Sequence, residues 1–230
     1  NGNGANSFEA LLSGPAWENE PDAQAILTRH RPGPDDVTQI IYTSGTTGEP
    51  KGVMHSANTV MANIIPYAQR LQLDAEDVVL MASPMAHQTG FMYGLIMPIL
   101  LKASAVILDV WEPLKAIDLV RAEGCSFTMA STPFLTDLAK HVAESGKTVP
   151  TLKTFLCAGA PIPGPLVEQA RAVLGTKIVS AWGMTENGAV TLIQLNDPDK
   201  RAFTTDGLPL PGVELKVVDF DGATLPPGEA

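Results

Sequence analysis

The sequence predicts an α/β fold: a mostly parallel sheet flanked by helices, with antiparallel strands near the C-terminal end. From residue 37 to residue 181, short apolar segments alternate with longer segments of helical periodicity. This alternation is typical of parallel strands joined by crossover helices. After Trp182 the pattern changes, and residues 190–195 and 213–219 alternate between apolar and polar side chains, as antiparallel strands do. We therefore expect an entry segment at 1–36, an α/β region at 37–188 and the start of an incomplete antiparallel region at 189–230.

Each parallel strand is expected where a short apolar run lies between turn-forming residues. The first run follows a proline-rich approach, and we expect it to be a buried strand that ends in a loop. The expected strands are residues 37–42, 78–82, 105–108, 126–130, 154–157 and 178–181.

The expected helices are marked by proline positions and by capping residues. Pro66 should kink the first long helix, and Gly124 should end another one. A third helix should begin with Thr132 as its N-cap and Pro133 as its first helical residue. The expected helices are residues 57–71, 90–101, 113–122, 132–144 and 165–174, with a further short one at 7–12.

The composition argues against two classes of partner. The net charge is −10 and the isoelectric point is near 4.8, whereas nucleic acids and anionic membranes bind basic surfaces. The apolar run at 91–101 is too short to span a bilayer, and no N-terminal signal pattern is visible. Cys125 and Cys157 lack metal or disulfide spacing, which favours buried free thiols in a reducing compartment. We expect a cytoplasmic protein without a transmembrane segment.

The most informative motif is the glycine- and hydroxyl-rich loop between Tyr42 and Gly52. Glycine lets backbone N–H groups converge on an anion, while hydroxyl and ammonium groups add donors. An ordinary solvated turn would explain the composition alone about equally well. A Walker-type loop is excluded because Pro50 precedes Lys51 and Gly52 follows it. The candidate polyphosphate-binding residues are Thr43, Ser44, Gly45, Thr46, Thr47, Gly48 and Lys51.

Three further motifs follow predicted strands, where ligands collect in parallel sheets. His87 lies within residues 83–90, Gly159-Ala160-Pro161 forms a turn poor in side chains, and residues 181–186 read Ala-Trp-Gly-Met-Thr-Glu. Each has a purely structural explanation: a satisfied histidine, an ordinary strand-to-helix turn and a chance Thr-Glu pair. Their shared position at strand ends, behind the phosphate loop, favours a nucleotide site instead.

The four motifs, in this order, resemble those of the adenylate-forming superfamily, which contains acyl-CoA synthetases, luciferases and peptide-synthetase adenylation domains. The resemblance covers nearly the whole chain and implies the N-terminal-domain fold of an AMP-forming acyl-CoA synthetase. It implies ATP, Mg²⁺, CoA and a carboxylic acid as ligands. By this resemblance the adenine would lie on a shelf formed by Gly159, Ala160 and Pro161, and against an aromatic stacking segment formed by Ala181, Trp182, Gly183 and Met184. Thr185 would donate to the α-phosphate and Glu186 would bind magnesium. His87 would be the histidine of the acyl site.

The implied reaction has two steps: a carboxylate attacks the α-phosphorus of ATP, and the thiol of CoA then displaces AMP from the acyl adenylate. Residues 81–93 and 181–188 resemble cyclohexanecarboxylate-CoA ligase and similar short- or medium-chain acid ligases. One alternative is an amino-acid-activating adenylation domain, which usually carries an aspartate in the acyl pocket. The residues after His87 are instead uncharged and mainly apolar, namely Thr89, Phe91, Met92 and Tyr93.

A second alternative is a nucleotide-binding module without chemistry of its own. The superfamily's ribose-binding aspartate lies in a Gly-Trp/Tyr-x-x-Thr-Gly-Asp block, and no such block follows Asp206. The hinge and the lysine of the superfamily's small C-terminal domain are not found either. We therefore expect a central piece of a longer enzyme that is inactive on its own.

Overall fold

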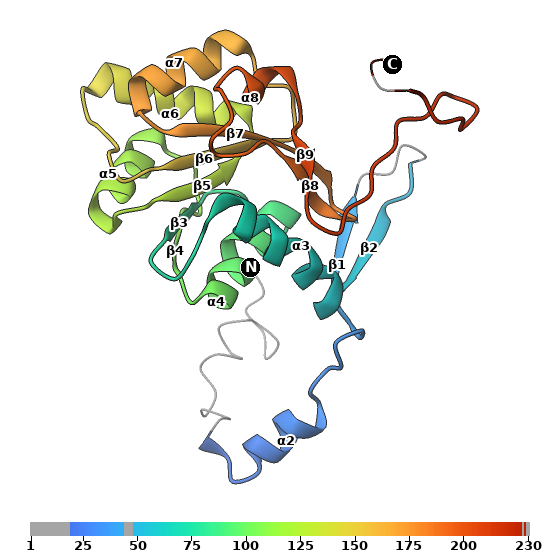
Figure 1. Cartoon of the computed structure of the whole chain (residues 1–230). Helices are drawn as coiled ribbons and strands as arrows, with labels where there is room; N and C mark the ends of the chain where they lie inside the picture. Colours follow the sequence, from blue (N-terminus) through green and yellow to red (C-terminus); the bar gives the residue numbers. More distant parts are fainter. Residues whose placement is uncertain (1–18, 44–47, 227, 229–230) are drawn as a thin grey trace.

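Seven strands form one sheet with helices on both faces (Figure 1). The computed structural model describes residues 19–43, 48–226 and 228. The strands of the large sheet are β3 (Val78–Met81), β4 (Ser104–Ile107), β5 (Phe127–Ala130), β6 (Thr154–Ala158), β7 (Lys177–Met184), β8 (Gly188–Leu192) and β9 (Leu208–Pro209). Their order is β4-β3-β5-β6-β7-β8-β9. The first five are parallel, and β8 and β9 join in antiparallel fashion, which confirms the predicted fold class.

The helices form two groups. The helix α5 (Pro113–Glu123) packs on α6 (Thr132–Ser145), which packs on α7 (Gly164–Leu174), so these three lie side by side on one face (Figure 1). The other face carries α3 (Ala57–Leu71), the π-helix η2 (Gly90–Ile96) and α4 (Met97–Leu101). Two short helices, α2 (Ala23–Arg29) and α8 (Arg201–Thr204), lie near the ends of the described chain.

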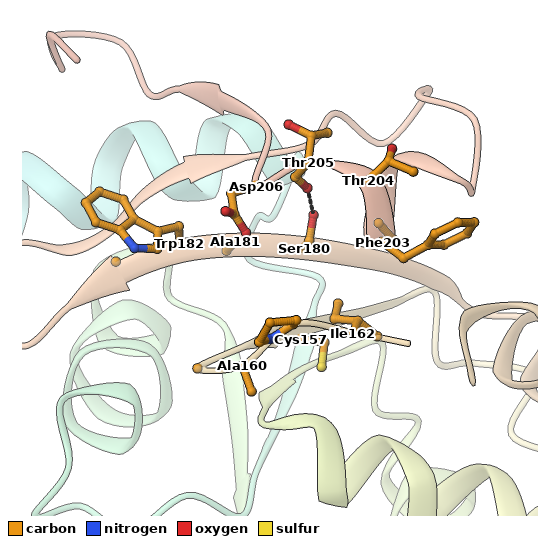
Figure 2. A pocket seen from close by; sticks show the side chains of 14 residues that line it. Cys157, Ala160, Ile162, Ser180, Ala181, Trp182, Phe203, Thr204, Thr205 and Asp206 are labelled. Atoms are coloured by element: carbon orange, nitrogen blue, oxygen red, sulfur yellow. Dashed lines mark hydrogen bonds between the residues drawn. The ribbon is translucent and has the colours of Figure 1, made fainter. Parts of the chain in front are cut away.

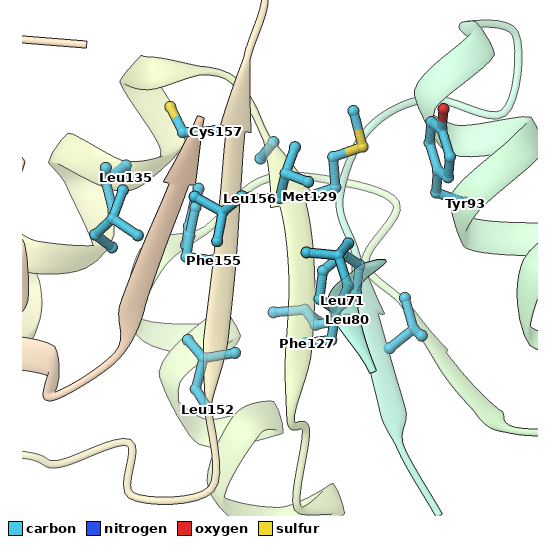
Figure 3. Close-up of a cluster of buried hydrophobic side chains, with 14 of the residues drawn as sticks. Leu71, Leu80, Tyr93, Phe127, Met129, Leu135, Leu152, Phe155, Leu156 and Cys157 are labelled. Atoms are coloured by element: carbon cyan, nitrogen blue, oxygen red, sulfur yellow. The ribbon is translucent and has the colours of Figure 1, made fainter. Parts of the chain in front are cut away.

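The core lies between the central strands and the two helix layers (Figure 3). Every residue of β5 and the first four of β6 are buried, as expected for parallel strands that are covered on both faces. Tyr67 of α3 stacks on Tyr93 of η2 with their ring centroids 4.3 Å apart. This aromatic pair joins the two helices that lie beside the candidate site.

The N-terminal strand differs from its prediction. Residues 37–42 do form a strand, β1 (Val37–Thr43), but it pairs with β2 (Lys51–Ser56) in an antiparallel hairpin that is separate from the large sheet. Alternate residues of β1 are exposed, and Tyr42 is 72% exposed, so the expectation of a buried strand was wrong. Nothing in the sequence pattern of residues 51–56 had predicted β2. The expected helix at 7–12 lies outside the described residues.

Three other elements required correction. Residues 213–219 form no strand and make only an isolated bridge between Val218 and Thr224. The residue that precedes α6 is Ser131, so Thr132 is the first helical residue and not the N-cap. The helix predicted at 90–101 is divided into η2 and α4. The remaining predicted strands of the large sheet, and the predicted helices on its two faces, occur within a few residues of the predicted ranges. Gly124 ends α5 in a left-handed conformation, as expected.

Candidate functional site

A cavity of about 480 Å³ opens where β6 ends, against the side of β7 (Figure 2). Its walls are the turn from Gly159 to Ile162, the part of β7 from Ser180 to Gly183, and the segment from Ala202 to Asp206. The carboxyl ends of parallel strands are the usual ligand site of open α/β sheets. The volume also falls within the range of about 300–1,000 Å³ that is typical of small-molecule pockets.

The cavity brings two of the predicted motifs together. Gly159, Ala160 and Pro161 lie at one side, and Ala181, Trp182 and Gly183 lie along β7 at the other. Trp182 is 42% exposed, so its indole ring is accessible to a ligand. A flat peptide turn that faces an aromatic ring can hold a planar heterocycle by stacking.

One wall of this cavity was not predicted. The segment that contains α8 folds back over β7, and Ser180 Oγ donates a hydrogen bond to the carbonyl oxygen of Thr205 over 2.9 Å (Figure 2). This places Asp206 at the rim beside Ala181. Phe203, Thr204 and Thr205 belong to no predicted motif, because only the antiparallel return of the chain through β8 brings them here. The residues of this wall are Ser180, Phe203, Thr204, Thr205 and Asp206.

The cavity also contains one of the two cysteines. Cys157 is buried, and burial raises the pKa of its thiol to about 11. Thr132 Oγ1 lies 3.6 Å from its sulfur. The thiol therefore remains protonated near neutral pH and contributes to the wall of the cavity rather than acting as a nucleophile.

The Thr-Glu motif lies just beyond the cavity, in the turn between β7 and β8. The strand β7 continues through Met184, so residues 182–184 lie on a strand and do not follow it as predicted. Thr185 is half-buried and Glu186 is exposed. At Gly183 an added Cβ would come within 1.9 Å of the carbonyl oxygen of Gly188, so only glycine permits the two strands to approach this closely.

A histidine that was absent from the predicted set holds this turn. His55, on β2, is 3% exposed and its Nε2 lies 2.8 Å from the carbonyl oxygen of Thr185. The base of the β1–β2 hairpin is thus in direct contact with the Thr-Glu segment. The only sequence signal was its place three residues after Gly52, which is too weak to identify a contact across 130 positions.

The predicted phosphate loop lies in the sequence between β1 and β2 of the same hairpin. Thr43 and Lys51 are paired across it, and Thr43 Oγ1 lies 3.5 Å from the carbonyl oxygen of Lys51. Gly48 is described and has a φ angle of 92°. The predicted residues Ser44, Gly45, Thr46 and Thr47 lie outside the described residues.

His87 lies apart from the cavity and is exposed in the segment before η2. Its Nδ1 accepts a hydrogen bond from the backbone N–H of Thr89 over 3.1 Å. The described residues show no hydrogen bond between His87 and the Thr-Glu turn. Of the apolar residues after His87, Met92 and Tyr93 are buried in the core, so they are not free to line an acyl pocket.

Two further observations concern the described residues as a whole. No three of their His, Cys, Asp or Glu side chains gather closely enough to hold a metal ion. None of their helices is both long enough and apolar enough to cross a bilayer.

Comparisons with known proteins agree with this fold. The family of AMP-binding enzymes matches residues 5–230. The medium-chain fatty-acid–CoA ligase of Escherichia coli (strain K12) is 37% identical over 194 residues, which are 84% of this chain and 34% of the relative. A feruloyl-CoA synthase from an Amycolatopsis species is 28% identical over 199 residues, which are 86% of this chain and 40% of the relative. The crystal structure of ATP-bound MatB from Rhodopseudomonas palustris aligns with a TM-score of 0.76 at 27% identity, over 86% of this chain and 39% of that one.

The fold and the match along nearly the whole chain define an adenylate-forming enzyme domain. The chain belongs to the AMP-binding enzyme family, and acyl-CoA ligases are among its relatives. It spans roughly a third to two fifths of the length of the relatives described above.

Proposed function

We propose that this chain is part of an enzyme that activates a carboxylic acid with ATP and transfers the acyl group to CoA. The observation that carries the proposal is the cavity between Gly159–Pro161 and Trp182, which lies next to the Thr-Glu turn. A surface that can hold a planar base therefore lies beside the turn whose residues we assign to the phosphates. Two of the relatives are a fatty-acid–CoA ligase and a feruloyl-CoA synthase, which supports the same chemistry.

In this proposal the adenine ring lies on the turn at Gly159, Ala160 and Pro161 and against Trp182. The carboxylate of Asp206, at the rim, can accept a hydrogen bond from the nucleoside. The loop from Thr43 to Lys51 binds the pyrophosphate part of ATP. Because bound phosphates need local donors in a chain of net charge −10, backbone N–H groups, hydroxyls and the single loop lysine supply them.

The turn supplies the remaining groups. The Thr185 hydroxyl donates to the α-phosphate, and Glu186 helps to hold Mg²⁺, which prefers hard oxygen ligands and keeps several waters. The residues present fit such an ion, because Glu186 is exposed and makes no ion pair among the described residues. When bound, Mg²⁺ neutralises negative charge on the phosphates and so eases attack by an anionic carboxylate.

We further propose that the acid is a short- or medium-chain or an alicyclic one. Thr89 and Phe91, the two of the named residues after His87 that the core does not bury, carry no charge. An acyl site next to them would offer nothing to pair with the ammonium group of an amino acid. This favours an acyl-CoA synthetase over an amino-acid-activating domain. His87 then lies at the entrance to the acyl site, and a cytoplasmic location would supply both ATP and CoA.

The test is a panel assay on the full-length product of the gene that encodes this chain. Octanoate, cyclohexanecarboxylate, ferulate and phenylalanine are each incubated with ATP, Mg²⁺ and CoA, and AMP, pyrophosphate and thioester are quantified. We expect AMP and thioester with an aliphatic or alicyclic acid. Nucleotide binding without AMP formation on any acid would support the module without chemistry instead. The 230 residues alone are expected to give no turnover, because the superfamily's small-domain lysine is not among them.

A further inference from the structure

Three buried polar side chains hold the turn that carries Thr185 and Glu186, and none of them is among the candidate ATP, magnesium or acyl-site residues named from the sequence. The first is His55 at the end of β2. A carbonyl oxygen can only accept, so His55 Nε2 carries the proton and donates to the Thr185 carbonyl over 2.8 Å. The other ring nitrogen, Nδ1, faces Thr59 Oγ1 at 3.1 Å. Both ring nitrogens are therefore used, which fixes the orientation of the imidazole.

The second side chain is Asn63, in the second turn of α3. Its Nδ2 donates to the carbonyl oxygens of Asn187 over 2.9 Å and Ala189 over 2.7 Å. Gly188 lies between these two acceptors with a φ angle of 67°, and a Cβ there would come within 2.7 Å of Asn63 Cγ. The carboxamide of Asn63 is thus packed directly against the backbone of the turn.

The third side chain is Tyr93 on η2, which is 1% exposed. Its hydroxyl donates to Asn63 Oδ1 over 2.6 Å and accepts from the backbone N–H of Ala189 over 2.8 Å. Burial raises the pKa of Tyr93 well above its usual value, so the phenol keeps the proton that it donates. Single-turn π-helices such as η2 are often found at functional sites.

Every side-chain nitrogen and oxygen of His55, Asn63 and Tyr93 therefore has a hydrogen-bond partner. Within the turn itself, the backbone N–H of Met184 donates to Asn187 Oδ1 over 3.1 Å, and the backbone N–H of Asn187 donates to the carbonyl of Met184 over 3.2 Å. The contacts from β2, α3 and η2 therefore fix the turn relative to the sheet. In a buried network, loss of one partner leaves the others unsatisfied, which is costly.

We propose that His55, Asn63 and Tyr93 are positioning residues, which fix where the side chains of Thr185 and Glu186 lie. Through Tyr93 they also connect this turn to the segment that follows His87. This rests on the proposed function, since it assigns those two residues to phosphate and magnesium. Displacement of a reacting group by about 1 Å can reduce a rate roughly a hundredfold. A positioning role therefore predicts a loss of kcat out of proportion to any loss of stability.

The chain offers a matched pair of variants for the test. Tyr93→Phe and Tyr67→Phe each remove one hydroxyl from the same stacked pair of rings. The Tyr67 hydroxyl donates to Met129 Sδ over 3.2 Å, and among the described residues it makes no hydrogen bond to the turn. Both variants are made in the full-length gene product. Carboxylate-dependent ATP–pyrophosphate exchange, the unfolding temperature, and hydrogen–deuterium exchange of the peptide that spans residues 182–190 are measured for each.

We expect Tyr93→Phe to lower kcat for exchange about tenfold to a hundredfold and to raise deuterium uptake in the turn peptide. Tyr67→Phe should stay within about twofold of the unsubstituted protein in both measurements. His55→Gln, which keeps a side-chain N–H donor, should retain more activity than His55→Ala. Equal kcat and equal deuterium uptake in the two tyrosine variants would overturn the positioning role. If the unsubstituted protein shows no exchange activity, the proposed function fails, and deuterium uptake alone then decides whether the network fixes the turn.

Discussion

The hydroxyl of Ser180 on β7 donates to the carbonyl oxygen of Thr205, which lies 25 positions later and 2.9 Å away. This contact fixes the segment after α8 against the strand that carries Trp182. The cavity consequently has a wall opposite the Gly159–Pro161 turn, and Asp206 reaches its rim. The site is thus formed by the sheet and the returning chain together.

Replacement of Trp182 tests the stacking surface. We expect Trp182→Ala to raise the KM for ATP about tenfold, because base–aromatic stacking contributes roughly 1–3 kcal/mol. Trp182→Tyr, which keeps an aromatic face, should stay within about threefold of the unsubstituted enzyme. The measurement is KM for ATP in pyrophosphate exchange by the full-length protein. An unchanged KM in the alanine variant would remove Trp182 from the nucleotide site.

Replacement of Glu186 tests the magnesium assignment. Glu186→Gln keeps the shape of the side chain but removes its charge, so we expect a several-fold higher Mg²⁺ concentration for half-maximal activity. The unfolding temperature should not change, because Glu186 is exposed. Glu144→Gln on α6 is the control, since Glu144 makes only a 4.0 Å exposed pair with Lys140. The same Mg²⁺ dependence in both variants would contradict the assignment.

The thiol of Cys157 should be unreactive in the folded protein although it lies in the wall of the cavity. Burial raises its pKa to about 11, so the thiolate fraction near pH 8 is small and the side chain is covered. We expect less than about a tenth of Cys157 to be alkylated in the time that suffices for complete labelling after unfolding. Peptide mapping by mass spectrometry measures this. Rapid labelling of the folded protein would show that the cavity wall opens.

Asp199 should contribute to the way in which the free energy of unfolding decreases at acid pH. Hydrogen bonding and charge from Lys177, whose Nζ lies 2.8 Å away, lower the pKa of Asp199. A carboxylate with a lowered folded-state pKa stabilises the protein above its unfolded pKa of about 3.9, and this contribution is lost as the pH falls through the folded-state value. Because Asp199 is 44% exposed, the contribution should be below about 1 kcal/mol.

The corresponding experiment compares Asp199→Asn with the unsubstituted protein by chemical denaturation at several pH values. The difference in the free energy of unfolding should be present at pH 7 and should disappear below the folded-state pKa. Asp221→Asn is the control, because Asp221 is exposed and makes no ion pair among the described residues. A difference that grew at low pH would contradict the lowered pKa.

The large sheet could be predicted because its parallel strands are short and apolar, and because α5, α6 and α7 between them each end at a glycine. The region 213–219 misled the prediction, since alternation of side chains indicates a strand only if a partner strand is available. Among the described residues it bridges only Val218 to Thr224. The β1–β2 hairpin was missed because β2 begins directly after the predicted phosphate loop and Gly52 interrupts its pattern of apolar residues.

The candidate site was predictable only where its residues are neighbours in the chain. Gly159–Pro161 and Ala181–Gly183 are contiguous motifs, and the structure brings them to one cavity. His55 and Asn63 carry no motif that identifies them, and Asp206 was not predicted as a site residue. They reach the site because β2 precedes α3 without a loop and because the chain reverses after β8. Such contacts depend on tertiary packing, which a single sequence does not encode in a readable pattern.

A crystal structure of the full-length protein with a non-hydrolysable ATP analogue and Mg²⁺ tests the central claim most directly. The account predicts that the adenine ring lies between the Gly159–Pro161 turn and Trp182, with the α-phosphate within hydrogen-bonding distance of the Thr185 hydroxyl and Mg²⁺ near Glu186. A nucleotide bound elsewhere, with this cavity unchanged, would contradict it.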